Sequence, residues 1–107
     1  MADLYGVLGQ AAPAAGVLTD IYTVPAARRA AIRVIVANRG SDDSFRVAVS
    51  PLGAAITNAH YVAYGQAILA NDSVSSAPFE VGGTDVVRVY STNGTISFTV
   101  SGLEEGT

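Results

Sequence analysis

The chain has 107 residues, half of them hydrophobic, and a formal net charge of −3; this length and apolar content predict a single domain whose core needs no metal or disulfide. It contains no cysteine and no lysine, which excludes thiol nucleophiles, Cys-ligated metal centres, Schiff-base chemistry and a phosphate-loop lysine. The acidic balance argues against nucleic acid as a partner, and the interruption of every apolar run before the roughly 18 residues of a membrane span argues against a membrane.

The first residues predict an extended N-terminal arm over 1–16, separate from a β-sandwich domain over 17–107. The stretch GVLGQAAPAAG is rich in Ala and Gly and offers little to bury. Four larger apolar side chains stand near the start of the arm: Leu4, Tyr5, Val7 and Leu8. They are enough to add a short strand to the sheet edge of a partner, and we expect them to contact that partner. A mobile tail without a role is the alternative.

From Val17 onward, short runs rich in Val, Ile, Tyr, Phe and Thr alternate with clusters of Pro, Gly, Asn and Asp, which is the pattern of an antiparallel all-β domain. No window of helical length shows the period of a helix. The expected strands cover residues 17–24, 29–38, 44–50, 58–64, 66–70, 73–81, 85–91 and 95–102. Their number and spacing predict an antiparallel β-sandwich or a jelly-roll-like fold.

Alternation of apolar and polar residues predicts which side chains face the core. The expected core residues are Ile32, Val34, Val36, Phe45, Val47, Val49, Val87, Val89, Ile96, Phe98 and Val100. Residues 31–37 (AIRVIVA) are apolar on both faces apart from Arg33, so they predict a central strand that is covered on both sides or that lies in a subunit contact. Asn93-Gly94 is a strong hairpin signal, and we expect strands 85–91 and 95–102 to pair directly.

Candidate catalytic groups are sparse. His60 is the single histidine, and no G-x-S-x-G motif accompanies it, which favours a partly buried or interfacial histidine over a catalytic one. Asp42 and Asp43 are adjacent in a loop and could hold a hard cation, but the flanking Arg39 and Arg46 favour surface ion pairs. We therefore expect no catalytic residue, no metal and no cofactor.

Arg28 and Arg29 begin a strand, where such a pair either contacts an acidic partner or guards a sheet edge. If the arm does not bind the partner, we expect the contact surface at Ile35, at these two arginines and at the loops 39–43 and 51–57.

Six segments carry a resemblance to known proteins: Tyr22–Ala26 (YTVPA), Val36–Gly40 (VANRG), Phe45–Pro51 (FRVAVSP), His60-Tyr61, Ala70–Ser73 (ANDS) and Asp85–Tyr90 (DVVRVY). Over roughly residues 20–103 the chain resembles small β-rich virion proteins of tailed bacteriophages. It departs from their pattern at Ala27-Arg28, where Gly-Lys is expected, and the resemblance does not cover residues 2–16.

The resemblance implies a non-enzymatic structural role as a head decoration, or cement, protein. It implies the major capsid protein as partner, self-association as a homotrimer, synthesis in the bacterial cytoplasm and a final place on the outer surface of the head. An accessory tail or adsorption protein is one alternative. A carbohydrate-binding β-sandwich that uses Tyr61, Tyr64 and Tyr90 as stacking platforms is the other.

Overall fold

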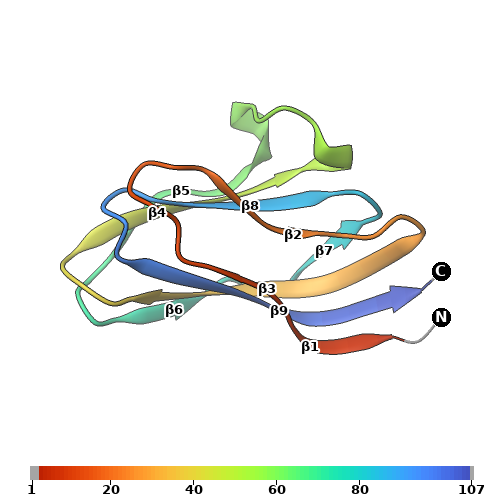
Figure 1. The fold of residues 1–107 in the computed structure, drawn as a ribbon, viewed down its shortest axis with the longest axis horizontal. Coiled ribbons are helices and arrows are strands. Elements are labelled where there is room, and N and C mark those ends of the chain that lie inside the picture. The colour runs from red at the N-terminus through yellow and green to blue at the C-terminus, as the bar shows by residue number, and fades with distance from the viewer. Residues whose placement is uncertain (1–2, 107) are drawn as a thin grey trace.

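The structure, a computed structural model, describes residues 3–106 as two antiparallel β-sheets packed face to face (Figure 1). The five-stranded sheet contains β1 (Leu4–Ala11), β9 (Ile96–Gly106), β3 (Arg28–Asn38), β6 (Ser73–Ser75) and β7 (Phe79–Gly82). The four-stranded sheet contains β2 (Thr19–Thr23), β8 (Val86–Ser91), β4 (Asp43–Ser50) and β5 (Tyr61–Ile68), in that order. The predicted all-β sandwich is therefore confirmed.

The strand order has the pairing pattern of a jelly roll. Both β6 and β7 lie along the same edge of β3, so they act as one interrupted strand. Counted that way, β1 pairs with the last strand, β2 with the last but one, β3 with β6–β7, and β4 with β5. This nested pairing is the arrangement of two sheets that curl over a common core.

The interruption between β6 and β7 has a local cause, and it corrects the expected continuous strand over 73–81. Pro78 has no N–H to donate to β3. At the break, the N–H of Val34 donates to the side-chain Oγ of Ser76 at 2.9 Å instead of to a backbone carbonyl, and the N–H of Ser76 donates to the carbonyl of Val34 at 2.9 Å.

The core lies between the sheets and follows the predicted alternation. Along β3, every second side chain from Arg28 to Asn38 is buried. Ten of the eleven expected core residues are at least 97% buried, and Val49, the eleventh, is half-buried and packs against the others. Phe98 and Phe45 meet edge to face across the core, with ring centroids 6.1 Å apart.

The expectation of a separate N-terminal arm is wrong. Residues 4–11 form β1, which pairs with β9 along its length, and Leu8 and Ala11 pack against the core. β1 also lies against β2 of the other sheet, where Gly9 sits directly beside the backbone carbonyl of Ile21. The segment does add a strand to a sheet edge through backbone hydrogen bonds, but the sheet belongs to its own chain.

The expected hairpin at Asn93-Gly94 is also wrong. β8 pairs with β2 and β4, whereas β9 pairs with β1 and β3, so the turn passes from one sheet to the other. A type I′ hairpin turn needs positive φ at both central residues. Only Gly94 has it, at 77°.

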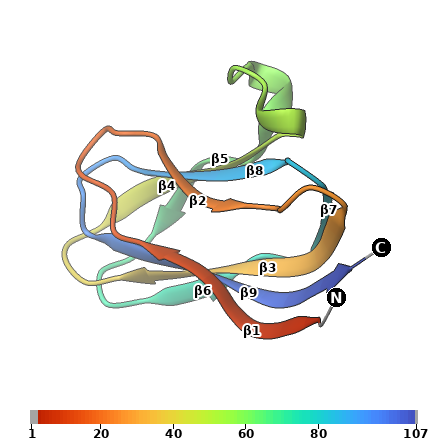
Figure 2. The ribbon, with the colours of Figure 1, turned by 45° about the vertical axis from the view of Figure 1, so that its right-hand side comes forward.

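Residues 51–60 form a loop that rises above the four-stranded sheet (Figure 1, Figure 2). It contains two short 3-10 helices, η1 (Pro51–Gly53) and η2 (Asn58–His60). The expected strands 58–64 and 66–70 are instead η2 followed by the single strand β5, which continues through Gly65 with a positive φ of 63°. The loop is anchored where the N–H of Leu52 donates to Asp85 Oδ1 at 3.0 Å.

Candidate partner-binding surfaces

The outer face of the five-stranded sheet, here called the open face, is covered by no other described part of the chain. Strand register sets Tyr5 of β1 beside Leu103 of β9, which in turn lies beside Ala31 of β3. One step along, Val7 lies beside Ser101 and then Arg33. The side chains of Tyr5, Val7 and Ile35 are 89%, 62% and 38% exposed. Three strands therefore present an uncovered face on which Tyr5, Val7 and Leu103 lie together, and the row of Arg33 and Ser101 separates Tyr5 and Leu103 from Ile35.

Four of the residues predicted to contact a partner belong to the open face. Tyr5, Val7, Arg29 and Ile35 all lie on the outward side of β1 or β3. The other three do not. Leu4, although 53% exposed, lies opposite the inward-facing Glu104, Leu8 packs on the core, and Arg28 is buried.

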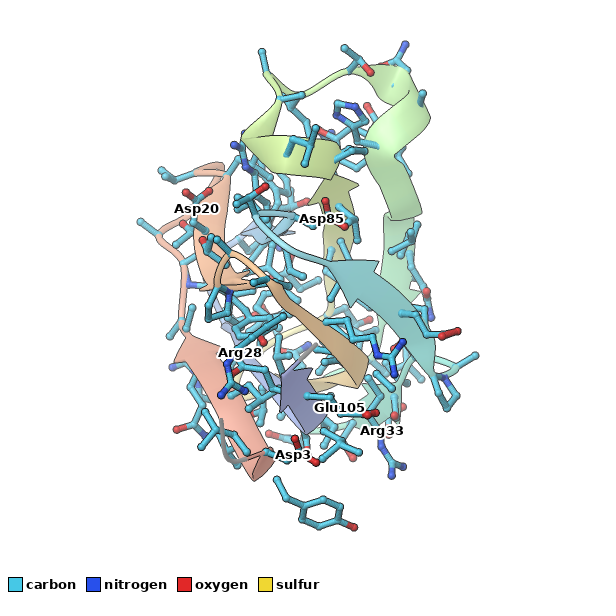
Figure 3. The ribbon with its side chains drawn as sticks, turned by 90° about the vertical axis from the view of Figure 1, so that its right-hand side faces the viewer. Asp3, Asp20, Arg28, Arg33, Asp85 and Glu105 are labelled. Carbon is cyan, nitrogen blue, oxygen red and sulfur yellow. The ribbon has the colours of Figure 1, made fainter. Side chains whose placement is uncertain are left out.

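Arg28 therefore cannot serve as the surface contact that the sequence predicted. Its Nη1 lies 3.2 Å from Glu104 Oε2, and Tyr22 donates a 2.6 Å hydrogen bond to Glu104 Oε1. Figure 3 shows Arg28 between the two layers, whereas Arg33 points away from them. Burial, the hydrogen bond and the negative charge of Glu104 together raise the pKa of Tyr22 far above its ordinary value, so its phenol stays protonated. Arg29, by contrast, is exposed and reaches Glu105 at 3.6 Å.

Asp43 is the centre of a buried polar cluster, not one half of a surface ion pair. Its Oδ1 accepts from the N–H groups of Ser44 and Asn93 at 2.7 and 3.0 Å. Its Oδ2 accepts from the hydroxyls of Ser91 and Thr95 at 2.7 and 2.9 Å. Burial alone would raise the pKa of Asp43, but these hydrogen bonds together hold it below its ordinary value.

The cluster at Asp43 ties together three loops at one end of the sandwich. The hydroxyl of Thr95 is also 2.8 Å from Asn38 Oδ1, and the side-chain amide of Asn38 donates to the carbonyls of Ser41 and Leu69 at 2.8 and 3.1 Å. The side chain of Asp42, which precedes Asp43 in the chain, accepts a hydrogen bond from the N–H of Ala70 at 2.9 Å. Both carboxylates thus hold loops in place, and neither pairs with the arginines that flank them in the sequence.

Arg46 lies on the outer face of the four-stranded sheet, between two tyrosine rings. Its guanidinium carbon is 4.3 Å from the ring centroid of Tyr64 on β5 and 4.4 Å from that of Tyr90 on β8. Tyr61 meets Tyr64 edge to face, with centroids 4.9 Å apart. The three tyrosines that the sequence proposed as stacking platforms are therefore brought together, around an arginine that sequence reasoning assigned to the loop aspartates. We call these four residues the tyrosine–arginine cluster.

An apolar cleft of about 440 Å³ opens between the edges of the two sheets, where β5 faces β6 and β7. Core residues such as Val34 and Phe45 form its floor, and Val62 and Gln66 of β5 form one rim. At the opposite edge of the sandwich, β1 and β2 lie against each other.

The remaining candidates have structural partners. His60 is half-buried, as expected, and its Nδ1 accepts from the N–H of Thr57 at 3.2 Å. Among residues 3–106, no three His, Asp or Glu side chains gather closely enough to hold a metal ion. No helix in the described part of the chain is long and apolar enough to cross a membrane.

No protein-family model matches the chain, and no curated protein matches it in a sequence search.

Proposed function

We propose that the chain is a non-enzymatic structural protein of a tailed-bacteriophage particle, a decoration protein that binds the outer surface of the head lattice through its open face. The observation that carries the proposal is the group of outward apolar side chains of Tyr5, Val7 and Leu103 on β1 and β9, with Ile35 beyond Arg33 on β3. Apolar patches of this kind mark interaction surfaces in folded proteins. The sequence resemblance to small virion proteins supplies the class of particle.

The open face suits a contact that must resist force. β3 lies in the interior of its sheet, bonded to β9 on one side and to β6 and β7 on the other. Side chains on such a strand have little freedom to move when a partner docks, so binding costs little conformational entropy. Arg33 lies on the same face and offers its guanidinium group to acidic residues of a capsid lattice.

The hydrogen bonds and ion pairs of the buried carboxylates support a binding role over a catalytic one. Asp43 accepts four hydrogen bonds and Glu104 is held by Arg28 and Tyr22. A general acid or base needs a lone pair or proton directed at a substrate. The lone pairs of these two carboxylates instead accept hydrogen bonds from, or pair with, other residues of the same chain.

The nested strand pairing is compatible with this role, because jelly rolls are frequent among viral capsid and lectin domains. The same fold would serve a head protein or a tail protein. A homotrimer on the lattice, and the major capsid protein as partner, are parts of the same proposal. An accessory tail protein remains the alternative.

Co-sedimentation of the purified protein with phage heads that lack it tests the proposal. We expect the wild-type protein to pellet with the heads, and Ile35→Asp or Val7→Asp to weaken binding about tenfold or more, because each places a charge in the apolar contact. Leu69→Asp is the matched control, since Leu69 is 64% exposed but lies away from the open face. Thermal melts show that each variant is folded. Failure of the wild type to bind heads, or full binding by both open-face variants, contradicts the proposal.

A further inference from the structure

We propose that the tyrosine–arginine cluster is a binding site for acidic saccharides, sugars that carry a carboxylate. The site lies on the four-stranded sheet, on the side of the molecule opposite the open face, and the inference does not depend on the proposed function. Four observations carry it: the position of Arg46, its uncommitted donors, the exposure of the tyrosines, and the charges beside them.

Arg46 is held in place before any ligand arrives. Its guanidinium plane lies between the rings of Tyr64 and Tyr90, at 4.3 and 4.4 Å from their centroids, and Tyr64 is itself braced by Tyr61. Stacking of this kind orients the planar fork of N–H donors and limits the entropy lost when a ligand binds. The side chain is also half-buried, which strengthens its electrostatic interactions compared with a fully exposed arginine.

The guanidinium N–H donors of Arg46 have no acceptor within the described chain. Arg28, Arg29 and Arg88 each lie beside a carboxylate, of Glu104, Glu105 and Asp20 respectively. The guanidinium of Arg46 makes no ion pair and no hydrogen bond with any residue of 3–106, and it stacks on the two rings. A guanidinium fork matches a carboxylate through two parallel hydrogen bonds, so a carboxylate is the group that completes this site.

The tyrosines supply the surface for a sugar ring. Arg46 occupies one side of Tyr64, yet Tyr64 remains 62% exposed. The C–H face of a pyranose packs on an aromatic ring, while the phenolic hydroxyl is available for the sugar hydroxyls. An acidic peptide would supply the carboxylate but not the flat, amphipathic ring that the tyrosines accommodate, which is why we assign a saccharide.

The charges beside the cluster extend the site along the sheet. Arg88 lies across from Ala48, two residues along β4 from Arg46, and Asp20 lies across from Arg88 on β2. Asp20 is therefore two strands away from Arg46, roughly 10 Å across the sheet, which is about the length of a disaccharide. Its carboxylate, 64% exposed, is an acceptor for sugar hydroxyls. Arg46 and Arg88 outnumber Asp20 here, so this face is locally positive on a chain whose net charge is −3.

The test is a binding experiment with defined probes. The wild-type protein is screened on a glycan array that includes oligogalacturonate, hyaluronan and α2,8-linked oligosialic acid, with chitotetraose and maltotetraose as neutral probes and a tetraglutamate peptide as a non-sugar acid. The best probe is then titrated by calorimetry at low and high salt. We expect at least one acidic saccharide to bind, the neutral sugars not to bind, and affinity to fall as salt rises.

Two variants and a control locate the binding. Arg46→Lys keeps the charge and loses the fork, and we expect affinity for the acidic saccharide to fall about tenfold or more. Tyr64→Ala, checked for folding by its melting temperature, should weaken binding similarly. Arg33→Lys makes the same chemical change on the open face and should leave affinity unchanged.

The proposal is overturned if no acidic saccharide on the array binds the protein. It is also overturned if Arg46→Lys does not weaken saccharide binding. Binding of tetraglutamate without any saccharide also overturns it and identifies the cluster as a contact for an acidic protein surface. None of these results bears on head binding, which is tested by substitutions on the other sheet.

Discussion

Replacing Asp43 with asparagine isolates the buried cluster that ties the loops at one end of the sandwich. An asparagine oxygen still accepts from the N–H groups of Ser44 and Asn93, but these hydrogen bonds lose their charge assistance, which roughly halves them. Thr95 can turn its hydroxyl to Asn38. The hydroxyl of Ser91, already accepting from the N–H of Gly94, is left as a buried donor without an acceptor. Together these losses predict a destabilisation of about 2–3 kcal/mol at neutral pH.

The same substitution has a signed dependence on pH. The pKa of Asp43 is lower in the folded protein than its ordinary value, so the ionised carboxylate contributes stability that is full above the unfolded pKa of about 3.9 and is lost as pH falls through the folded pKa. Asparagine does not titrate. The difference in unfolding free energy between wild type and Asp43→Asn should therefore be largest near neutral pH and shrink below about pH 4.

Guanidinium chloride unfolding at pH 7 and at about pH 2.5 measures both effects. Asp42→Asn is the control: the Asp42 side chain lies in the same loop but accepts a single exposed hydrogen bond, from Ala70. We expect that control to change stability by less than about 1 kcal/mol. Equal stability of wild type and Asp43→Asn at pH 7, or a difference that grows as pH falls, would refute the role assigned to this carboxylate.

Three further outcomes are expected. Phe98→Ala empties the centre of the core and should lower the free energy of unfolding by roughly 3–5 kcal/mol, measured by denaturant titration; a loss under about 1 kcal/mol contradicts the packing described. Gly102→Ala places a Cβ against the backbone carbonyl of Ala31 and should lower the melting temperature sharply, whereas Gly82→Ala, which meets only a side-chain oxygen at 3.7 Å, should not. Deleting residues 4–11 removes β1 and the core contacts of Leu8, and should lower the melting temperature by roughly 5–10 °C or more; an unchanged melting temperature would support a separate arm.

The inward faces of the strands could be predicted from the sequence because period-2 alternation is a local property. The alternation at Phe45, Val47 and Val49, and again at Ile96, Phe98 and Val100, identified core positions without knowledge of which strand pairs with which. The sequence did not predict β1 as a strand of this sheet, because β1 is held by backbone pairing with β9 and backbone groups are the same in every residue type. A Gly- and Ala-rich segment can form an edge strand when a long neighbour is available.

The wrong predictions concern contacts between residues that are far apart in the sequence. Asn93-Gly94 encodes a tight turn, but whether that turn closes a hairpin or crosses between sheets depends on β4, which takes β8 as its neighbour. Arg28 and Glu104 are far apart in the sequence, so nothing near Arg28 signalled that it would be buried. The partner of Arg46 was assigned by sequence proximity to the loop aspartates, whereas its real neighbours come from two other strands.

The candidate partner-binding surface was also predicted only in part. The apolar character of residues 31–37 on both faces predicted a central strand that is covered on both sides or that lies in a subunit contact. β3 is central in its sheet, but the described chain covers only its inner face, and the subunit contact stays a prediction. The set of contact residues was only partly placed, because the sequence could not say which of two consecutive residues, Arg28 or Arg29, faces outward. A shift of one residue reverses the face of every side chain on a strand.

Cryo-electron microscopy of the proposed phage particle tests the central proposal most directly. We expect density for the jelly roll on the outer surface of the head, with the open face of β1, β9 and β3 turned toward the major capsid protein and Ile35 buried in that contact. Density for the protein on the tail, its absence from the particle, or a head-bound protein whose open face is turned to solvent would contradict it.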